Sequence, residues 1–115
     1  MEFENELDKL RYMLDKAKIP YDSIKEEFKK EITKNYPEYY EGNRRYSRNQ
    51  IIYRANNDLT EWLLDGICQM GSYGVKEGLI ETYGPLGTDA EGDPLVLYAE
   101  DVFKIIEEDW NRIKD

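Results

Sequence analysis

Histidine is missing from this chain of 115 residues, and cysteine occurs once, at Cys68. The lack of histidine removes the commonest general base and the commonest metal ligand. One cysteine without histidine also excludes an internal disulfide, a zinc site of the usual Cys/His kind and a Cys–His nucleophile pair. Cys68 lies in an apolar stretch, where we expect a small buried hydrophobic side chain rather than a reactive thiol.

Long apolar runs are absent as well, and no segment approaches the roughly 18 apolar residues that a membrane-spanning helix needs. Three of the first six residues are glutamates and none is basic, which is the opposite of a secretion signal. Basic residues are outnumbered by 25 acidic residues to 16, for a net charge of -9. Such a charge disfavours stable nucleic-acid binding. We therefore expect a cytoplasmic protein without a membrane or nucleic-acid partner.

Apolar residues at helical spacing predict a first helix over residues 3–17, which ends before Ile19-Pro20 because the residue preceding proline is pushed out of the helical region. Ser23 and Glu26 have the spacing of a capping box and predict a second helix that continues to residue 34, with an apolar edge of Ile24, Phe28 and Ile32. We expect residues 35–48 to form a long connection.

Strands are predicted next. Short β-branched and aromatic runs at residues 50–54, 59–69 and 79–83 are typical of strands, and residues 95–97 are a further candidate. A turn cluster at residues 56–58 makes the first two strands a hairpin. The last helix is predicted by an apolar stripe, Val102, Phe103, Ile106, Trp110 and Ile113. This order predicts one α+β domain over residues 1–115, with an N-terminal helix or helix pair, a three- to four-stranded antiparallel sheet and a C-terminal helix packed on one face.

Carboxylates are the remaining candidates for chemistry. An alternating loop cluster has the oxygen ligands that calcium and magnesium prefer, but it lacks the EF-hand spacing, and we expect a solvated acidic turn rather than a metal site. A second set could supply an acid/base pair if it converged on a cleft, which its spacing does not require. We predict no catalytic residue, metal or cofactor. The two sets are Asp89, Glu91 and Asp93, and Asp65, Glu77 and Glu81.

The charge is distributed unevenly. Residues 1–42 have a net charge of -3 and residues 55–115 of -10, whereas residues 43–54 have +4 and no acid. Four of the six arginines lie in this short segment, together with tyrosines and amides. The guanidinium group of arginine binds phosphate through paired hydrogen bonds, tyrosine rings stack on bases, and side-chain amides form hydrogen bonds with base edges. The alternative is that these arginines form ion pairs with carboxylates of neighbouring elements.

A glycine-rich stretch, Gly71-Ser72-Tyr73-Gly74, is the second feature suited to ligand binding, because glycine lets a backbone approach a ligand closely. It is not a Walker loop, and a tight turn between strands is the simpler explanation of these glycines. If this turn and the arginine-rich strand share one edge of the sheet, the two signals reinforce each other. The predicted ligand-binding residues are Arg44, Arg45, Arg48, Asn49, Tyr53, Ser72 and Tyr73.

Several short motifs occur along the chain: Leu10–Asp15 before Ile19–Tyr21, then Asn49–Tyr53, Leu64–Gln69, Gly71–Gly74 with Gly78–Glu81, and Ala99–Val102. Together these motifs resemble a family of short proteins encoded by phages and prophages of Gram-positive bacteria. The resemblance covers most of the chain, least well residues 22–48, and Lys18 stands where the family leads us to expect glycine. No catalytic motif is carried over.

The resemblance implies a small accessory protein that acts inside a bacterial host cell against its defences. We expect it to bind and sequester a small anionic, nucleotide-derived immune signal without catalysis. The alternatives are a protein-binding inhibitor of a host defence factor that acts through acidic surfaces, and a purely structural domain. Because Trp62 and Trp110 could line an interface as readily as a core, a homo-oligomer stays open.

Overall fold

Apolar stripes on two helices and alternating apolar residues on the strands meet in one core. The computed structural model describes residues 2–37, 45–55 and 61–114. The helices are α1 (Glu6–Lys16), α2 (Lys30–Asn35) and α3 (Ala99–Lys114), and the strands are β1 (Asp22–Glu27), β2 (Tyr46–Tyr53), β3 (Leu64–Ile67), β4 (Ile80–Tyr83) and β5 (Leu95–Leu97).

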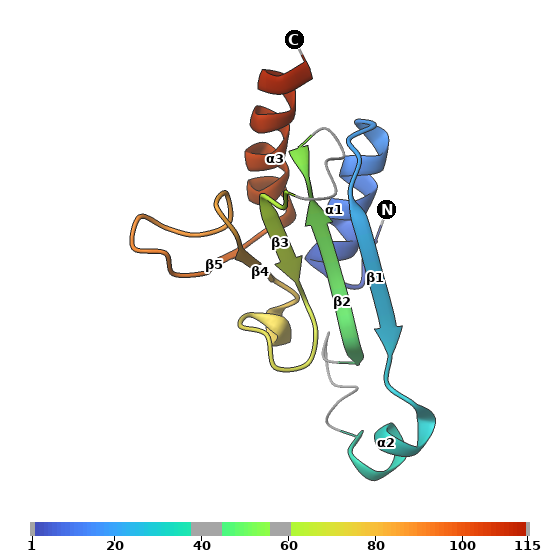
Figure 1. Cartoon of the computed structure of the whole chain (residues 1–115). Helices are drawn as coiled ribbons and strands as arrows, with labels where there is room; N and C mark the ends of the chain where they lie inside the picture. Colours follow the sequence, from blue (N-terminus) through green and yellow to red (C-terminus); the bar gives the residue numbers. More distant parts are fainter. Residues whose placement is uncertain (1, 38–44, 56–60, 115) are drawn as a thin grey trace.

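The strands form one antiparallel sheet in the order β1-β2-β3-β4-β5, so neighbours in the chain are neighbours in the sheet (Figure 1). The predicted α+β class is confirmed, with five strands instead of three or four. The strand predicted at residues 59–69 forms at Leu64–Ile67 and is the central strand of the sheet. Residues 95–97 form an edge strand.

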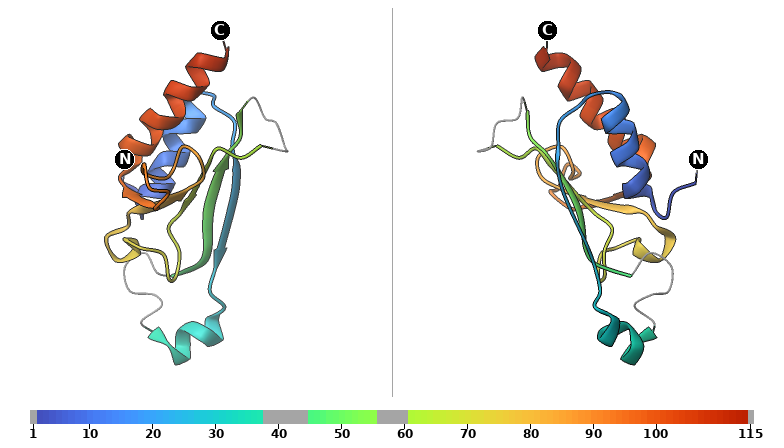
Figure 2. Two further views of the ribbon diagram at one scale, coloured as in Figure 1. Left: turned by 60° about the vertical axis from the view of Figure 1, so that its left-hand side comes forward. Right: turned by 90° about the vertical axis from the view of Figure 1, so that its right-hand side faces the viewer.

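Helices α1 and α3 lie on the same side of the sheet and pack against each other (Figure 2). Their inward stripes are fully buried: Leu7, Leu10 and Leu14 from α1, and Val102 and Ile106 from α3. Gly66 of β3 faces these helices, where a Cβ would lie 3.7 Å from a Leu7 methyl group and 3.1 Å from Ile80. A glycine at this position therefore lets α1 lie close to the sheet.

The ends of α1 follow local rules. Asn5 caps its start by accepting a hydrogen bond from the backbone N–H of Asp8 at 2.8 Å. After the helix, Lys18 has a φ of 59°, the left-handed conformation that glycine adopts most readily.

Arg11 connects α1 to the edge strand β1 and to its neighbour β2. Its guanidinium donates to Ser23 at 2.8 Å, to Asp8 at 2.9 Å and to Asn49 at 2.7 Å. It also donates to the backbone carbonyls of Ile24 and Gln50, each at 3.2 Å. Because charge-assisted hydrogen bonds are the stronger ones, this single side chain fixes the helix against β1 and β2.

The predicted helix over residues 23–34 is wrong in its first half. Residues Asp22–Glu27 are strand β1, and only Lys30–Asn35 form a helix, which extends beyond the end of the sheet (Figure 1). The apolar spacing that suggested the helix, Ile24 to Phe28, is four residues, which fits a period of two as well as a helical turn. Pairing with β2 decided between the two.

Strand β2 begins at Tyr46, earlier than the predicted strand at 50–54, because its first residues pair with the unpredicted β1. The register shifts at Ser47, where Tyr46 opposes Glu27 and Arg48 opposes Glu26. This bulge turns Tyr46 toward the helices, and its side chain is 1% exposed. The turn predicted at 56–58 and part of the connection predicted at 35–48 lie outside the described residues. In the part of the chain that the structure describes, no helix has the length and apolar character to cross a membrane.

Candidate functional site

The face of the sheet opposite α1 and α3, here called the open face, has an ordered arrangement of side chains. Cross-strand pairs place Ile24 beside Gln50, Gln50 beside Ile67, Ile67 beside Glu81 and Glu81 beside Val96. In the adjacent row, Asp22, Ile52, Asp65 and Tyr83 are neighbours in that order. Apolar and polar groups therefore alternate in both rows.

One set of diagonal neighbours on this face is apolar, and its members form a zigzag that crosses all five strands. We call it the apolar band: Ile24, Ile52, Ile67, Tyr83 and Val96. At about 4.8 Å per strand, the band is about 19 Å long. Val96 is 41% exposed and the other four are half-buried, and none of the five packs against the buried core cluster. Sequence reasoning missed the band because its first position lies on the strand that was predicted as a helix.

Asp65 lies between apolar neighbours of the band. The Gln50 side chain donates a hydrogen bond to it at 2.8 Å. Burial raises the pKa of Asp65, and the Gln50 hydrogen bond and the charge of Arg48 only partly offset that increase. Asp65 therefore holds its charge less readily than an exposed aspartate does.

Glu81 is the second carboxylate on this face, and it is only 2% exposed. It accepts hydrogen bonds from the backbone N–H of Tyr73 at 3.0 Å and from the hydroxyl of Tyr83 at 2.7 Å. The bond to Glu81 raises the pKa of Tyr83 to about 12. The glycine-rich turn thus folds over the open face and closes Glu81 off from solvent.

Arg45 of the predicted ligand-binding set is occupied within the protein. Its guanidinium pairs with Glu4, lies 3.7 Å from Glu27 and sits over the ring of Tyr46 at 4.7 Å. Tyr46 also donates to Glu4, and this hydrogen bond lowers the pKa of Glu4, with Arg45 adding to the effect. Arg45 is therefore in the internal ion-pair arrangement that was the alternative to ligand binding.

Arg48 and Arg54 differ from each other. Arg54 pairs with Asp22 at 2.9 Å. Arg48 is exposed on the open face, donates to the Gln50 side chain at 3.2 Å and forms no ion pair with any described carboxylate. Arg44 lies outside the described residues. Of the described arginines in the segment, Arg48 has the guanidinium best placed to meet a ligand.

Asn49 and Tyr53 face the helices, because neighbouring positions of a strand point to opposite sides. Both are 0% exposed. Asn49 accepts from Arg11, and Tyr53 donates to Asp109 at 2.7 Å. Burial raises the pKa of Tyr53, and the bond to Asp109 adds to the increase. In this arrangement neither side chain can reach a ligand beside Arg48.

The glycine-rich turn lies at the same end of the sheet as the start of β2, since the backbone N–H of Met70 donates to the carbonyl of Tyr46 at 2.9 Å. Ser72 is buried and closes the turn by donating to the Gln69 carbonyl at 2.7 Å. Tyr73 is 72% exposed. A surface hollow of about 260 Å³ is lined by residues 71–77. Arg48, Tyr73 and this hollow therefore lie toward one end of the molecule.

Two of the candidate acid/base carboxylates, Asp65 and Glu81, lie on the open face, but neither lines one of the hollows described here, and Glu77 is exposed on the turn at Val75–Glu77. Cys68 is 0% exposed, as expected, and burial raises the pKa of its thiol to about 12. A thiol that is buried and protonated is a poor nucleophile.

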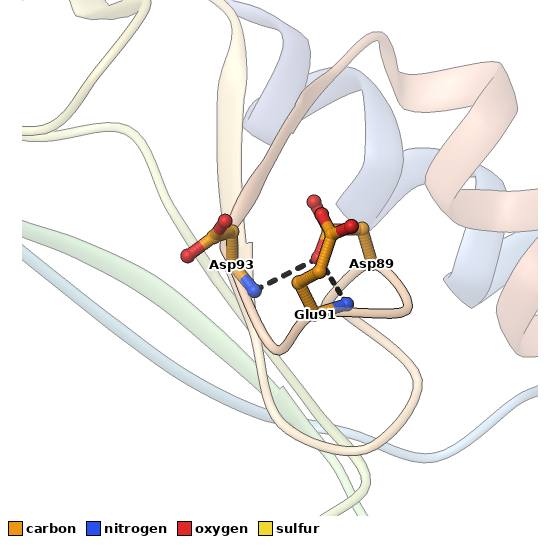
Figure 3. Close-up of side chains that lie close together, drawn as sticks. All are labelled: Asp89, Glu91 and Asp93. Carbon is orange, nitrogen blue, oxygen red and sulfur yellow. Dashed lines mark hydrogen bonds between the residues drawn. The ribbon is translucent and has the colours of Figure 1, made fainter.

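Asp89, Glu91 and Asp93 are exposed, and their carboxylate oxygens lie within 4.8 Å of one another (Figure 3). One oxygen of Asp89 accepts from the backbone N–H groups of Glu91 at 2.9 Å and Asp93 at 3.0 Å. This hydrogen-bonded turn is enough to account for the closeness of the three acids.

A second hollow, of about 340 Å³, lies against α3 beside Leu86, Ile105 and Asp109. Asp109 is 6% exposed and already holds hydrogen bonds from Tyr53 and Arg112. The fold and its surfaces thus define a two-layer α+β domain with one helix-covered and one open sheet face. Comparisons of the chain with known protein families, with curated proteins and with solved structures found no match.

Proposed function

We propose that this chain is a non-catalytic binding protein that recognises another protein through the open face of its sheet. The apolar band supports this proposal. Antiparallel sheets often leave one face in water, but that face is then usually polar. Here apolar groups cross the whole width of the sheet without packing on the core, and contiguous apolar surface of this kind marks interaction sites.

The resemblance to phage proteins adds a setting to this proposal. In that setting the chain is an accessory protein of a phage or prophage, and its partner is a defence protein of the bacterial host. Inhibition then requires only binding. It needs no reactive group, in keeping with a chain that lacks histidine and buries its one thiol.

A photo-crosslinking amino acid at Ile52 tests the proposal in bacterial cells that produce the protein. We expect a defined crosslinked partner from Ile52 and none from the same group at Lys104, an exposed position of α3. The purified partner should then bind the original protein, and Ile52→Asn and Ile67→Asn should each weaken that complex at least about tenfold. Equal crosslinking from both positions, or a complex that tolerates both substitutions, would rule the open face out.

A second candidate function is sequestration of a small nucleotide-derived anion. Its support is the placement of Arg48, Tyr73 and the hollow at residues 71–77 toward one end of the molecule. Arg48 would contact phosphate, and the exposed ring of Tyr73 would stack on a base. The ligand would be held and released unchanged, as in a sponge for an immune signal.

A thermal-shift screen with adenine nucleotides and cyclic dinucleotides tests this candidate. A ligand at 100 times its dissociation constant stabilises the fold by about 2.7 kcal/mol. Arg48→Gln should remove the shift, whereas Arg54→Gln, with the same charge change at the other end of β2, should keep it. Recovery of a cleaved nucleotide would indicate an enzyme that uses Asp65, Glu77 or Glu81 instead.

A further inference from the structure

Two carboxylates on the open face lack a cation. Asp65 receives a hydrogen bond from Gln50, and Glu81 receives two, from Tyr73 and Tyr83. Neither forms an ion pair with any lysine or arginine that the structure describes. Glu81 is closed off beneath the turn, whereas Asp65 is only half-buried among residues of the apolar band. The charge of Asp65 therefore lies within the surface that the proposed function makes a binding site.

Two carboxylates on the helix-covered side show how this fold pairs a charge that lies partly in its interior. Asp8 meets Arg11 at 2.9 Å and Lys25 at 3.0 Å, and the nearly buried Asp109 meets Arg112 at 2.7 Å. Asp65 has no such partner among the described residues, although it lies between apolar side chains of the open face.

A partner that covered the band would remove water from Asp65. Burying an unpaired charge is costly, whereas a charge that gains an ion pair and hydrogen bonds is tolerated. Protonating Asp65 would avoid the cost only in part, because the protonated group would still need a hydrogen-bond acceptor. The partner that fits must therefore bring apolar side chains for the band and a cationic group for Asp65.

We infer that the open face binds an amphipathic basic protein segment, whose apolar side chains lie on the band and whose lysine or arginine pairs with Asp65. This inference rests on the proposed function and names its partner class. A second copy of this chain fits poorly, because face-to-face contact would oppose two surfaces that each have Glu26 and Asp65 against Arg48, while Asp22 is already paired with Arg54. Glu26 adds charge next to Arg48 and extends the acidic surface along β1.

Three synthetic amphipathic peptides test the inference. All have the same leucine stripe, and their polar face is lysine, glutamine or glutamate. We expect the lysine peptide to bind at least about tenfold more tightly than the glutamine peptide, with an affinity that falls as salt rises. Asp65→Asn should weaken lysine-peptide binding about fivefold. Glu108→Gln, which removes one charge from the exposed side of α3, should leave it unchanged.

Apolar contact is tested with Ile52→Asn, with Ile67→Asn as a second variant in case the first disturbs folding. Each should weaken all three peptides, whereas Ile32→Asn on α2 should not. If the glutamine or glutamate peptide binds the original protein as tightly as the lysine peptide, the inference of a basic partner is wrong. The proposal that the open face is a binding surface is then unaffected. If no peptide binds below about 1 mM, or binding ignores both open-face isoleucines, the proposed function fails with it.

Discussion

The two faces of this sheet are built from the same strands and differ in how their side chains are satisfied. Ile51 and Ile52 are consecutive residues of β2, but Ile51 is 0% exposed under the helices and Ile52 is half-buried on the open face. Arg11 and Arg48 differ in the same way. Arg11 donates five hydrogen bonds on the helix-covered face. On the open face, Arg48 donates one hydrogen bond, to the Gln50 side chain.

This difference shows which groups the fold itself uses. On the helix-covered face, Arg11 and Tyr53 form hydrogen bonds between elements, and those of Arg11 stabilise the arrangement of α1 on β1 and β2. On the open face, the apolar band does not pack against the core cluster, and Asp65 forms no ion pair with a described lysine or arginine. Groups that the fold leaves unsatisfied are the ones that a partner can satisfy.

The largest expected effect comes from the isoleucine pair. Ile51→Ala should lower the free energy of unfolding by about 2 to 5 kcal/mol, because it removes fully buried methyl groups and leaves a cavity. Ile52→Ala should cost about 1 kcal/mol or less, since that side chain is partly in water. Urea unfolding of both variants checks the contrast. Equal losses would mean that the open face is packed against something in solution.

Arginine gives the next contrast. Arg11→Gln should cost about 2 to 4 kcal/mol, because Asp8 and the backbone carbonyls at 24 and 50 lose a charged donor. Arg48→Gln should change stability by less than about 0.5 kcal/mol, as exposed substitutions usually do. The same unfolding measurement compares the two. A large cost at Arg48 would show that its charge is needed by the fold and is not free for a ligand.

Glycine in the turn over the open face is a smaller test. At Gly74, with a φ of 82°, a Cβ would lie 2.5 Å from a Val96 methyl group, whereas at Gly71, with a φ of 86°, it would meet nothing within 4 Å. Gly71→Ala should therefore cost about 1 kcal/mol from backbone strain alone. Gly74→Ala should cost about 2 to 3 kcal/mol and loosen the turn above Glu81. Similar costs at both positions would argue against close packing of the turn on β5.

The smallest effect is a pH dependence. Because burial raises the pKa of Asp65 in the folded state, its contribution to stability is fully present below the unfolded pKa, near 3.8, and is lost as the pH rises through the folded value. Asp65→Asn should therefore gain stability relative to the original protein between about pH 3 and pH 7. Thermal unfolding across this range measures the gain, and Glu108→Gln serves as the matched loss of charge. A gain that does not depend on pH would contradict the raised pKa.

Much of the fold could be predicted from the sequence, because strong local periodicity survives in the structure. The stripe through Leu7, Leu10 and Leu14 predicted α1, the stripe through Val102 and Ile106 predicted α3, and both are buried as expected. The α+β class and the buried Cys68 followed from the same kind of reasoning. Such elements depend on burying one apolar face, and the spacing of their residues defines that face directly.

The candidate site was harder to predict. The ligand-binding set was chosen for its composition, and β2 divides it, because Arg48 faces outward while Asn49 and Tyr53 face the helices. The bulge at Ser47 then moves Tyr46 to the helix side as well. Composition gives the residues that are available to a site, but alternation along a strand decides which of them share a surface.

The sequence by itself therefore determined the fold class, the two packed helices, the absence of histidine chemistry and the concentration of positive charge in one segment. Only the tertiary structure decided that residues 22–27 form a strand. Apolar residues four positions apart fit a helix and a strand equally well, and pairing with β2 favours the strand. Only the tertiary structure formed the apolar band, because its five residues come from five strands and become neighbours through cross-strand register, which no local spacing encodes.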